Sequence, residues 1–137
     1  MRTNLFRVLG VLQAFIGIGA VAGGLLLILD PSGTNLGTPI ELLEKTPFTT
    51  FLVPGIVLFI VNGLGSFTGG IASFVRLRYA GELAMALGVF LVLWIVVQVY
   101  WMEPHWLHAF YLALGILEVA LGWLVRKSWR RSEEATT

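Results

Sequence analysis

The sequence predicts an all-α membrane protein, built as an up-down bundle of four transmembrane helices. Hydrophobic residues make up 57% of its 137 residues and charged residues only 12%, whereas a soluble domain carries about 25% charged residues. The mean hydropathy is +0.85. The lysines and arginines lie almost entirely between four apolar blocks, each long enough for the roughly 20 residues that cross a bilayer.

Each apolar block is predicted to be a helix, because backbone polar groups in hydrocarbon must be satisfied within the segment. The predicted spans cover residues 5–29, 50–75, 83–101 and 106–125, and a basic tail follows over 126–137. The second and third connections are short, which favours antiparallel neighbours and a compact bundle. The whole chain then forms one integral membrane domain.

The first span has to be distinguished from a cleaved signal peptide. Arg2 and Arg7 precede it, and Ala20-Val21-Ala22 resembles a cleavage site. The apolar stretch continues from Gly23 to Leu29, so cleavage would fall inside the membrane. The segment is therefore expected to stay as an anchor.

The first connection is the longest and is predicted to hold a turn and a short helix. Asp30-Pro31-Ser32-Gly33 has the residue order of a type I turn. Thr38, Pro39 and Glu41 then match a helix start with a capping box. Pro47 ends this short helix, whose apolar side is expected to lie along the outer membrane surface.

The positive charges are sorted by side. Eight of the nine lie at the two termini and in the second connection, only Lys45 lies in the first connection, and none lies in the third. This is the positive-inside pattern of a multi-pass membrane protein with both termini in the cytoplasm. The same sorting, with a net charge of +1, argues against a nucleic-acid partner.

Small and polar residues form stripes on three spans, as expected where helices pack in lipid. The stripes are Gly10, Gln13, Gly17, Ala20 and Gly24 on the first span, Gly55, Asn62 and Gly69 on the second, and His108, Tyr111, Gly115, Glu118 and Gly122 on the fourth. We expect them to face the bundle interior, or to supply the contact of a homo-oligomer or a membrane partner.

Glu118 is the charged residue that lies deep inside a predicted span. It is roughly 12 Å from the boundary at Arg126, where a charge costs about 2.5–3.5 kcal/mol. Gln13 reaches a similar depth, Asn62 lies near the midplane, and Tyr111 lies above them. Two interpretations stay open: a protonated Glu118 hydrogen-bonds to Gln13 or Asn62 and holds helices together, or the group handles a ligand or protons.

Gln98 and His108 are polar candidates near the outer face. His105 and His108 are three residues apart, but no histidine on another helix completes a metal or haem site, so no metal is predicted. The absence of cysteine excludes disulfides and thiolate ligands. No nucleotide, zinc or nucleophile motif is present, so no catalytic residue is predicted and the sequence favours a non-enzyme.

The order of turns and glycines resembles that of small, uncharacterised four-span bacterial membrane proteins, loosely of the DoxX-like group. The residues that carry the resemblance are Asp30-Pro31-Ser32-Gly33, Gly37, Pro39, Thr46-Pro47-Phe48, Pro54-Gly55, Asn62-Gly63, Gln98-Val99, Trp106-Leu107 and Tyr111. The resemblance implies a four-helix membrane protein and, since some DoxX-like proteins are linked to quinone-coupled oxidoreductases, a redox partner. It carries over no catalytic residue.

Three functions remain open. The leading hypothesis is a non-enzymatic accessory subunit or binder of a lipophilic ligand or lipid, without a cofactor of its own. The second is a membrane subunit of a quinone-linked oxidoreductase, with Gln98, His108 or Tyr111 near the quinone. The third is an oligomeric conductor of protons or small solutes that uses Glu118.

Overall fold

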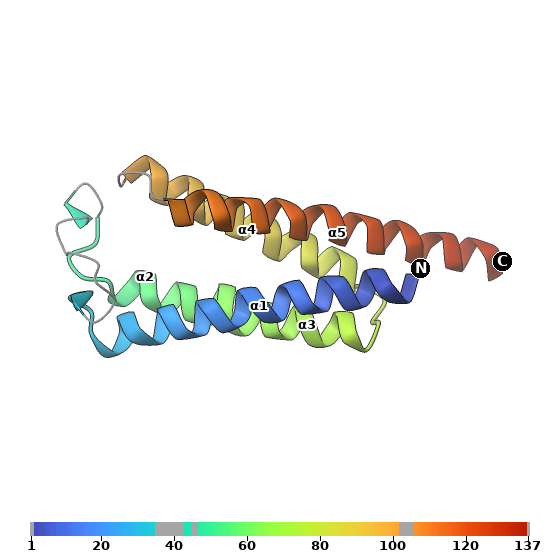
Figure 1. Cartoon of the computed structure of the whole chain (residues 1–137), viewed down its shortest axis with the longest axis horizontal. Coiled ribbons are helices and arrows are strands. Elements are labelled where there is room, and N and C mark those ends of the chain that lie inside the picture. The colour runs from blue at the N-terminus through green and yellow to red at the C-terminus, as the bar shows by residue number, and fades with distance from the viewer. Residues whose placement is uncertain (1, 35–42, 45–46, 102–105, 137) are drawn as a thin grey trace.

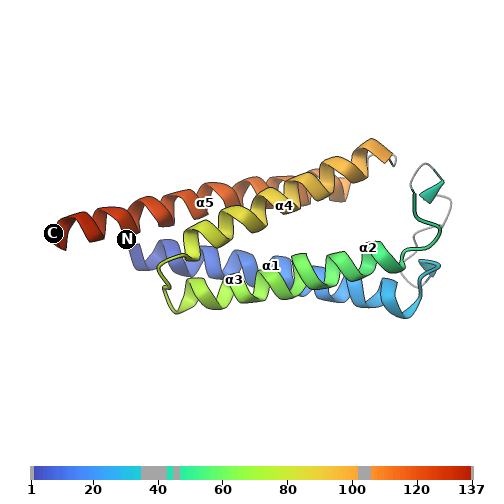
Figure 2. The same cartoon turned by 180° about the vertical axis from the view of Figure 1, so that it is seen from behind.

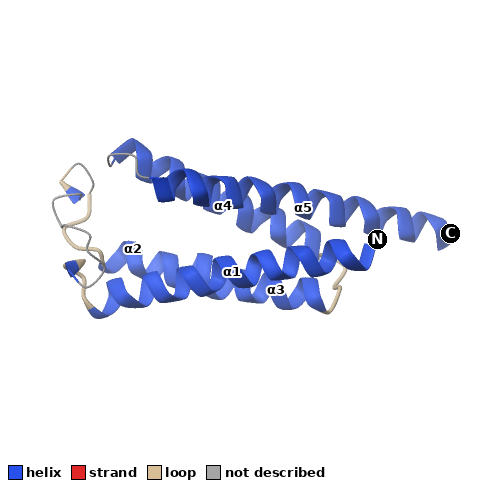
Figure 3. Cartoon of the chain, viewed as in Figure 1, coloured by secondary structure: helices blue, strands red, loops and turns tan. Residues whose placement is uncertain are grey.

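The computed structural model describes residues 2–34, 43–44, 47–101 and 106–136, and the regular structure in these ranges is helical (Figure 3). The elements are α1 (Arg2–Leu29), α2 (Leu52–Val57), η3 (Leu58–Leu64), α3 (Gly65–Phe74), α4 (Ala80–Trp101) and α5 (Trp106–Thr136). Because α2, η3 and α3 follow one another without a break, they form a single continuous helix, which we also call a rod. Within the described ranges, four helices are long and apolar enough to cross a membrane. For the described residues, the prediction of an all-α fold with four helices long and apolar enough to span a membrane is therefore confirmed.

The four rods form two antiparallel pairs (Figures 1 and 2). In the first pair α1 packs along α2, η3 and α3, and in the second pair α4 packs along α5. Both chain ends lie at the same end of the bundle, where the first pair contacts the second. Toward the opposite end the ribbons of α2 and α4 diverge (Figure 1), and α4 contacts α3 and η3 instead.

Within each pair the helices touch through glycines. A Cβ atom placed on Gly24 would lie 2.8 Å from the carbonyl oxygen of Gly55, and one on Gly88 would lie 2.8 Å from that of Gly115. Backbone therefore packs against backbone. The predicted interior stripes are confirmed, since their glycines, Ala20 and their polar residues are buried, and His108 and Tyr111 are half-buried.

Between the pairs the contacts are made mainly by apolar side chains. An inner apolar cluster at the chain-end side contains Phe6, Leu9, Ala72, Ala80, Ala84 and Val125. An outer apolar cluster contains Ile16, Leu91 and Ile95, with Tyr111 and Leu112 packed against them. The rings of Phe6 and Trp129 add an edge-to-face contact with centroids 6.4 Å apart.

The second span is not the uniform α-helix that the sequence suggested. Its middle, η3, is a π-helix of seven residues. A π-helix has a wider turn, because each N–H bonds five residues back, and such segments are frequent at functional sites. The widened turn lies where Asn62 and Gly63 are buried, with Gly63 against Val21 of α1.

The connections are described in part. The predicted turn after the first span is confirmed, because the Gly33 N–H donates to the Asp30 carbonyl oxygen at 3.0 Å and Gly33 has a φ of 78°. The short helix expected from Thr38 lies largely outside the described residues, although the described Leu43 is buried in a cluster with Leu27 and Phe51. The predicted turn at 102–105 also lies outside them.

The second connection is shorter than predicted, since α4 begins at Ala80. The Leu77 N–H donates to the Ala72 carbonyl and the Arg76 N–H to the Ser73 carbonyl, which is the hydrogen-bond pattern of a Schellman motif. Arg76 has a φ of 55° at the position where glycine is usual. At the same end of the bundle, α5 continues as a helix through the predicted basic tail.

Candidate functional site

The polar candidates lie on the interior faces of the spans. Among the described residues, the buried polar or charged side chains are Gln13, Asn62, Ser66, Ser73 and Glu118, each at most 2% exposed. They come from α1, η3, α3 and α5. Burial of polar groups in an apolar interior is costly unless they are hydrogen-bonded, so the partners of each one matter.

Gln13 is held by α3. The Ser73 hydroxyl donates to the Gln13 side-chain oxygen at 2.7 Å, and both residues are buried. Gly69 makes room for the amide, since a Cβ atom there would lie 2.6 Å from Gln13 Nε2. The amide nitrogen itself has no hydrogen-bond partner. Gln13 is therefore oriented by one bond and keeps its donor for another group.

Glu118, on α5 of the second helix pair, lies beside Gln13. Its carboxyl group is 1% exposed, and its polar neighbour is Gln13 of α1. The two side chains are not in hydrogen-bond geometry, and neither carboxyl oxygen has a partner. The structure thus brings Gln13 and Glu118 together, as predicted, and leaves three of their polar atoms without a partner.

Asn62 lies farther along the seam. It precedes Gly69, the residue opposite Gln13, by seven positions, which corresponds to roughly 10 Å along a helix. Asn62 is 2% exposed, and its side-chain nitrogen has no partner. We regard Asn62 as a separate buried amide on the wide turn of η3, and not as part of the Gln13–Glu118 pair.

Tyr111 lies farther from the chain ends of the bundle than Glu118 does. It packs against the outer apolar cluster, and its hydroxyl oxygen lies 2.9 Å from where a Cβ atom of Gly19 would be. Gln98 and His108 are half-buried and lie still farther out. Gly88 of α4 faces Gly115 of α5, which lies one helical turn from Glu118. Gln98 follows Gly88 by ten residues, or roughly 15 Å of helix. These three residues are therefore not neighbours of Glu118.

Apolar clusters enclose the Gln13–Glu118 pair on both sides along the bundle axis. Leu9 and Val125 of the inner apolar cluster lie toward the chain ends, and Ile16 and Leu91 of the outer apolar cluster lie toward the opposite end. The polar pair is thus a small polar site within apolar surroundings. A carboxyl group offers acceptors and an amide nitrogen offers donors, which suits a partner that carries both a hydroxyl and a carbonyl.

Ser73 is the functional candidate that the sequence analysis missed. A signal for it was present, because Asn62, Ser66, Gly69 and Ser73 follow offsets of 4, 7 and 11 along the chain, the spacing of one helix face. The seven-residue repeat of Gly55, Asn62 and Gly69 has Ser66 beside it but ends before Ser73.

A metal site finds no support in the described ranges, where no group of three or more His, Asp or Glu side chains could hold a metal ion. His105 lies outside those ranges.

No protein-family model, no curated protein and no solved structure matches this chain. The resemblance to DoxX-like proteins stays a prediction, and the function has to be argued from the site itself.

Proposed function

We propose that this protein is a non-enzymatic, multi-pass protein of the bacterial inner membrane that binds a lipophilic small molecule between its two helix pairs. The observation that carries this proposal is the buried carboxyl group of Glu118, which has no hydrogen-bond partner on either oxygen and lies beside the unpartnered amide nitrogen of Gln13.

A purely structural role would require a hydrogen bond between Glu118 and Gln13, and the described geometry does not contain one. A residue that joins helices in lipid does so through hydrogen bonds, each worth about 0.6 kcal/mol on average. An unsatisfied buried polar group instead costs about 1–3 kcal/mol, and more if it is charged. Ser73 and Gln13 make such a bond, but Glu118 makes none. A ligand that donates to Glu118 and accepts from Gln13 would offset this cost.

The surroundings favour a closed binding site over proton conduction. A proton path needs polar groups or water on both sides of the relay, whereas the inner and outer apolar clusters flank Glu118. The ligand would reach the site sideways from the membrane, between the two helix pairs. Its apolar part would then lie between the pairs.

The ligand chemistry follows from the two side chains. Glu118 requires a hydroxyl or amine donor, and Gln13 Nε2 requires an oxygen acceptor. A quinone in its partly or fully reduced form carries both on an apolar body. This favours an accessory subunit of a quinone-linked enzyme as the physiological setting. We expect the headgroup at Gln13 and Glu118 instead of at Gln98, His108 or Tyr111.

The orientation is part of the proposal. The end of the bundle that carries both chain ends and the 75–79 connection also holds eight of the nine basic residues, so it should face the cytoplasm. The chain has no cysteine, so single cysteines can report the side. Thr49→Cys should react with an impermeant maleimide in intact cells, and Ser132→Cys only after permeabilisation. The reverse pattern would refute the orientation.

The test of ligand binding is mass spectrometry of the protein purified in mild detergent from its native membrane. We expect one lipophilic molecule to be retained at high occupancy, and Glu118→Gln to reduce that occupancy at least about tenfold, the equivalent of 1.4 kcal/mol. Glu82→Gln is the matched control, because Glu82 is a half-buried carboxylate of the second pair that faces Arg126. Equal occupancy in all three proteins, or only bulk lipid with the wild type, would refute the proposal.

A further inference from the structure

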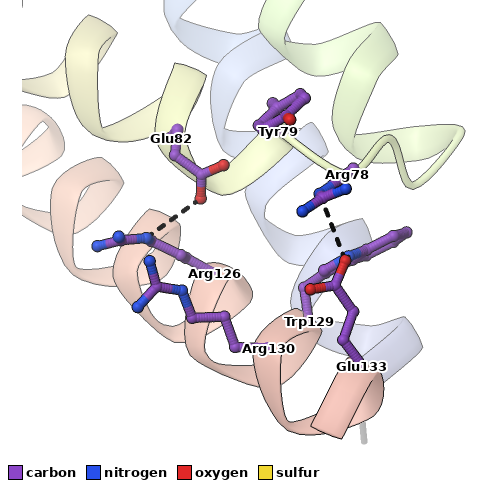
Figure 4. A pocket seen from close by; sticks show the side chains of 7 residues that line it. All are labelled: Arg78, Tyr79, Glu82, Arg126, Trp129, Arg130 and Glu133. Atoms are coloured by element: carbon purple, nitrogen blue, oxygen red, sulfur yellow. Dashed lines mark hydrogen bonds and ion pairs between the residues drawn. The ribbon is translucent and has the colours of Figure 1, made fainter. Parts of the chain in front are cut away.

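The end of the bundle that carries the chain termini has two cavities that share Arg126 and Arg130. The first, of about 240 Å³, lies between the start of α4 and the last turns of α5 and is also lined by Arg78, Tyr79, Glu82, Trp129 and Glu133 (Figure 4). The second, of about 330 Å³, lies on α5 and is also lined by Trp123, Lys127, Arg131 and Glu134. Cations outnumber carboxylates, five to three, around the two cavities together.

The carboxylates of the first cavity are already engaged. Glu133 forms an ion pair with Arg78, with 3.3 Å between Arg78 Nε and Glu133 Oε1, and it accepts a hydrogen bond from Trp129 Nε1 at 2.8 Å. Glu82 forms an ion pair with Arg126, with 3.4 Å between Arg126 Nε and Glu82 Oε1, a contact that leaves the two terminal nitrogens of Arg126 available to another acceptor.

Arg130 adds a second guanidinium beside that of Arg126. Both groups extend into the same space from successive turns of α5 (Figure 4), and no ion pair of Arg130 occurs among the described residues. Like charges repel unless an anion lies between them, so this arrangement is suited to a phosphate, which guanidinium groups bind with paired hydrogen bonds.

The apolar surface next to the arginines indicates where the anion comes from. Trp123 and Leu124 are 49% and 39% exposed and come directly before Val125 and the basic residues. Lys127 Nζ lies 4.9 Å from the centre of the Trp123 ring. Because α5 is continuous, residues 123, 127, 130 and 134 follow one face. Exposed apolar surface therefore passes into positive charge along that face, as at a bilayer surface.

We propose that Arg126 and Arg130 bind the phosphate of an anionic phospholipid in the leaflet at this end of the bundle. The phosphate oxygens accept from the two guanidinium groups, and the acyl chains lie along Trp123 and Leu124. Basic pockets between transmembrane helices are suited to such headgroups. A free phosphate ion would make no use of the apolar surface. The site shares no residue with the Gln13–Glu118 pair, so either proposal can fail while the other stands.

The test is native mass spectrometry of the full chain in nanodiscs that contain equal amounts of phosphatidylglycerol and phosphatidylcholine. We expect phosphatidylglycerol to be retained preferentially. Each arginine near the surface contributes about fivefold in affinity, so Arg130→Gln should reduce the preference about fivefold and the double variant with Arg126→Gln about twenty-five-fold. Arg7→Gln is the matched control, since Arg7 is an exposed arginine at the same end that lines neither cavity.

Three further results show whether the lipid preference comes from a phospholipid site, from a site for a free anion or from the total charge of this end. Glu82→Gln should raise the preference, because it frees Arg126. Inorganic phosphate at millimolar concentration should not displace the lipid; if it does, the site takes a free anion and the lipid assignment is wrong. An equal loss of preference with Arg7→Gln would show that only the total charge of this end matters, and it would overturn the site.

Discussion

The contacts within each helix pair and the contacts between the two pairs are built differently. Within a pair, glycines bring backbone against backbone, as at Gly24 with Gly55 and at Gly88 with Gly115. Between the pairs, apolar side chains meet on either side of Gln13 and Glu118.

This difference shows which interface can adjust to a ligand. Backbone contacts depend on close fit and lose their packing when the helices separate by a fraction of an ångström. Large side chains can change rotamer and keep contact. We therefore expect the pairs to behave as rigid units and the seam between them to be the adaptable part of the molecule. The following substitutions test this view.

Replacing Glu118 with leucine should have the largest effect on stability, and the effect should be stabilising. An unsatisfied buried polar group costs about 1–3 kcal/mol, and Glu118 makes no hydrogen bond within the protein. In the ligand-free protein, an apolar residue of similar size should therefore stabilise by about that amount. Unfolding with a denaturing detergent in mixed micelles, followed by circular dichroism, measures this change. Ligand occupancy should fall at the same time. If Glu118→Leu is less stable than the ligand-free wild type, Glu118 instead has a structural role in holding the helices together.

Gly24→Ala should disrupt the first pair. The new Cβ atom would lie 2.7 Å from the backbone nitrogen of Phe59, so the helices must separate, at a cost of about 1–3 kcal/mol. Gly23→Ala is the control on the same helix, because its Cβ atom would lie 3.6 Å from a leucine methyl group. The same unfolding assay compares them, and equal stability of the two variants would contradict backbone contact within the pair.

Ser73→Ala removes the one hydrogen bond that orients Gln13. We expect a loss of about 0.5–1.7 kcal/mol in the free energy of unfolding, the range for hydrogen bonds between membrane helices. Ligand affinity should also fall, because the Gln13 amide is no longer fixed. Ser128→Ala, at a half-buried position on α5, is the control. If Ser73→Ala changes stability but leaves ligand binding intact, Gln13 does not contact the ligand.

Glu82→Gln should have the smallest effect on stability. Its ion pair with Arg126 is more than one-third exposed on both sides, and such surface pairs contribute about 0–1 kcal/mol. The effect should disappear at high salt, as measured by the same unfolding assay with and without salt. A salt-independent loss larger than that of Ser73→Ala would mean that this end of the second pair is drier than its exposure indicates.

The sequence predicted the spans well because hydropathy and helix length are properties of each segment alone. Leu29 and Trp101 end their helices where expected. The stripes of small and polar residues also predicted that Gln13 and Glu118 face the bundle interior. It did not reveal Ser73 as the partner of Gln13, because that contact joins residues 60 positions apart and depends on how two helices are rotated against each other. Hydropathy likewise gives no signal for the π-helix, whose composition is that of any apolar segment.

The wide turn of η3 rotates the two halves of the second span relative to each other about the helix axis. A π-turn acts as an extra residue inserted into an α-helix, and one residue corresponds to about 100° of rotation. The half before η3 is therefore out of phase with the half after it by that angle, and both halves still present glycines to α1. Deleting one residue between 58 and 64 would restore a plain helix and turn Gly55 away from Leu27, its present neighbour. The length of this span, and not only its composition, is thus tied to its glycine positions.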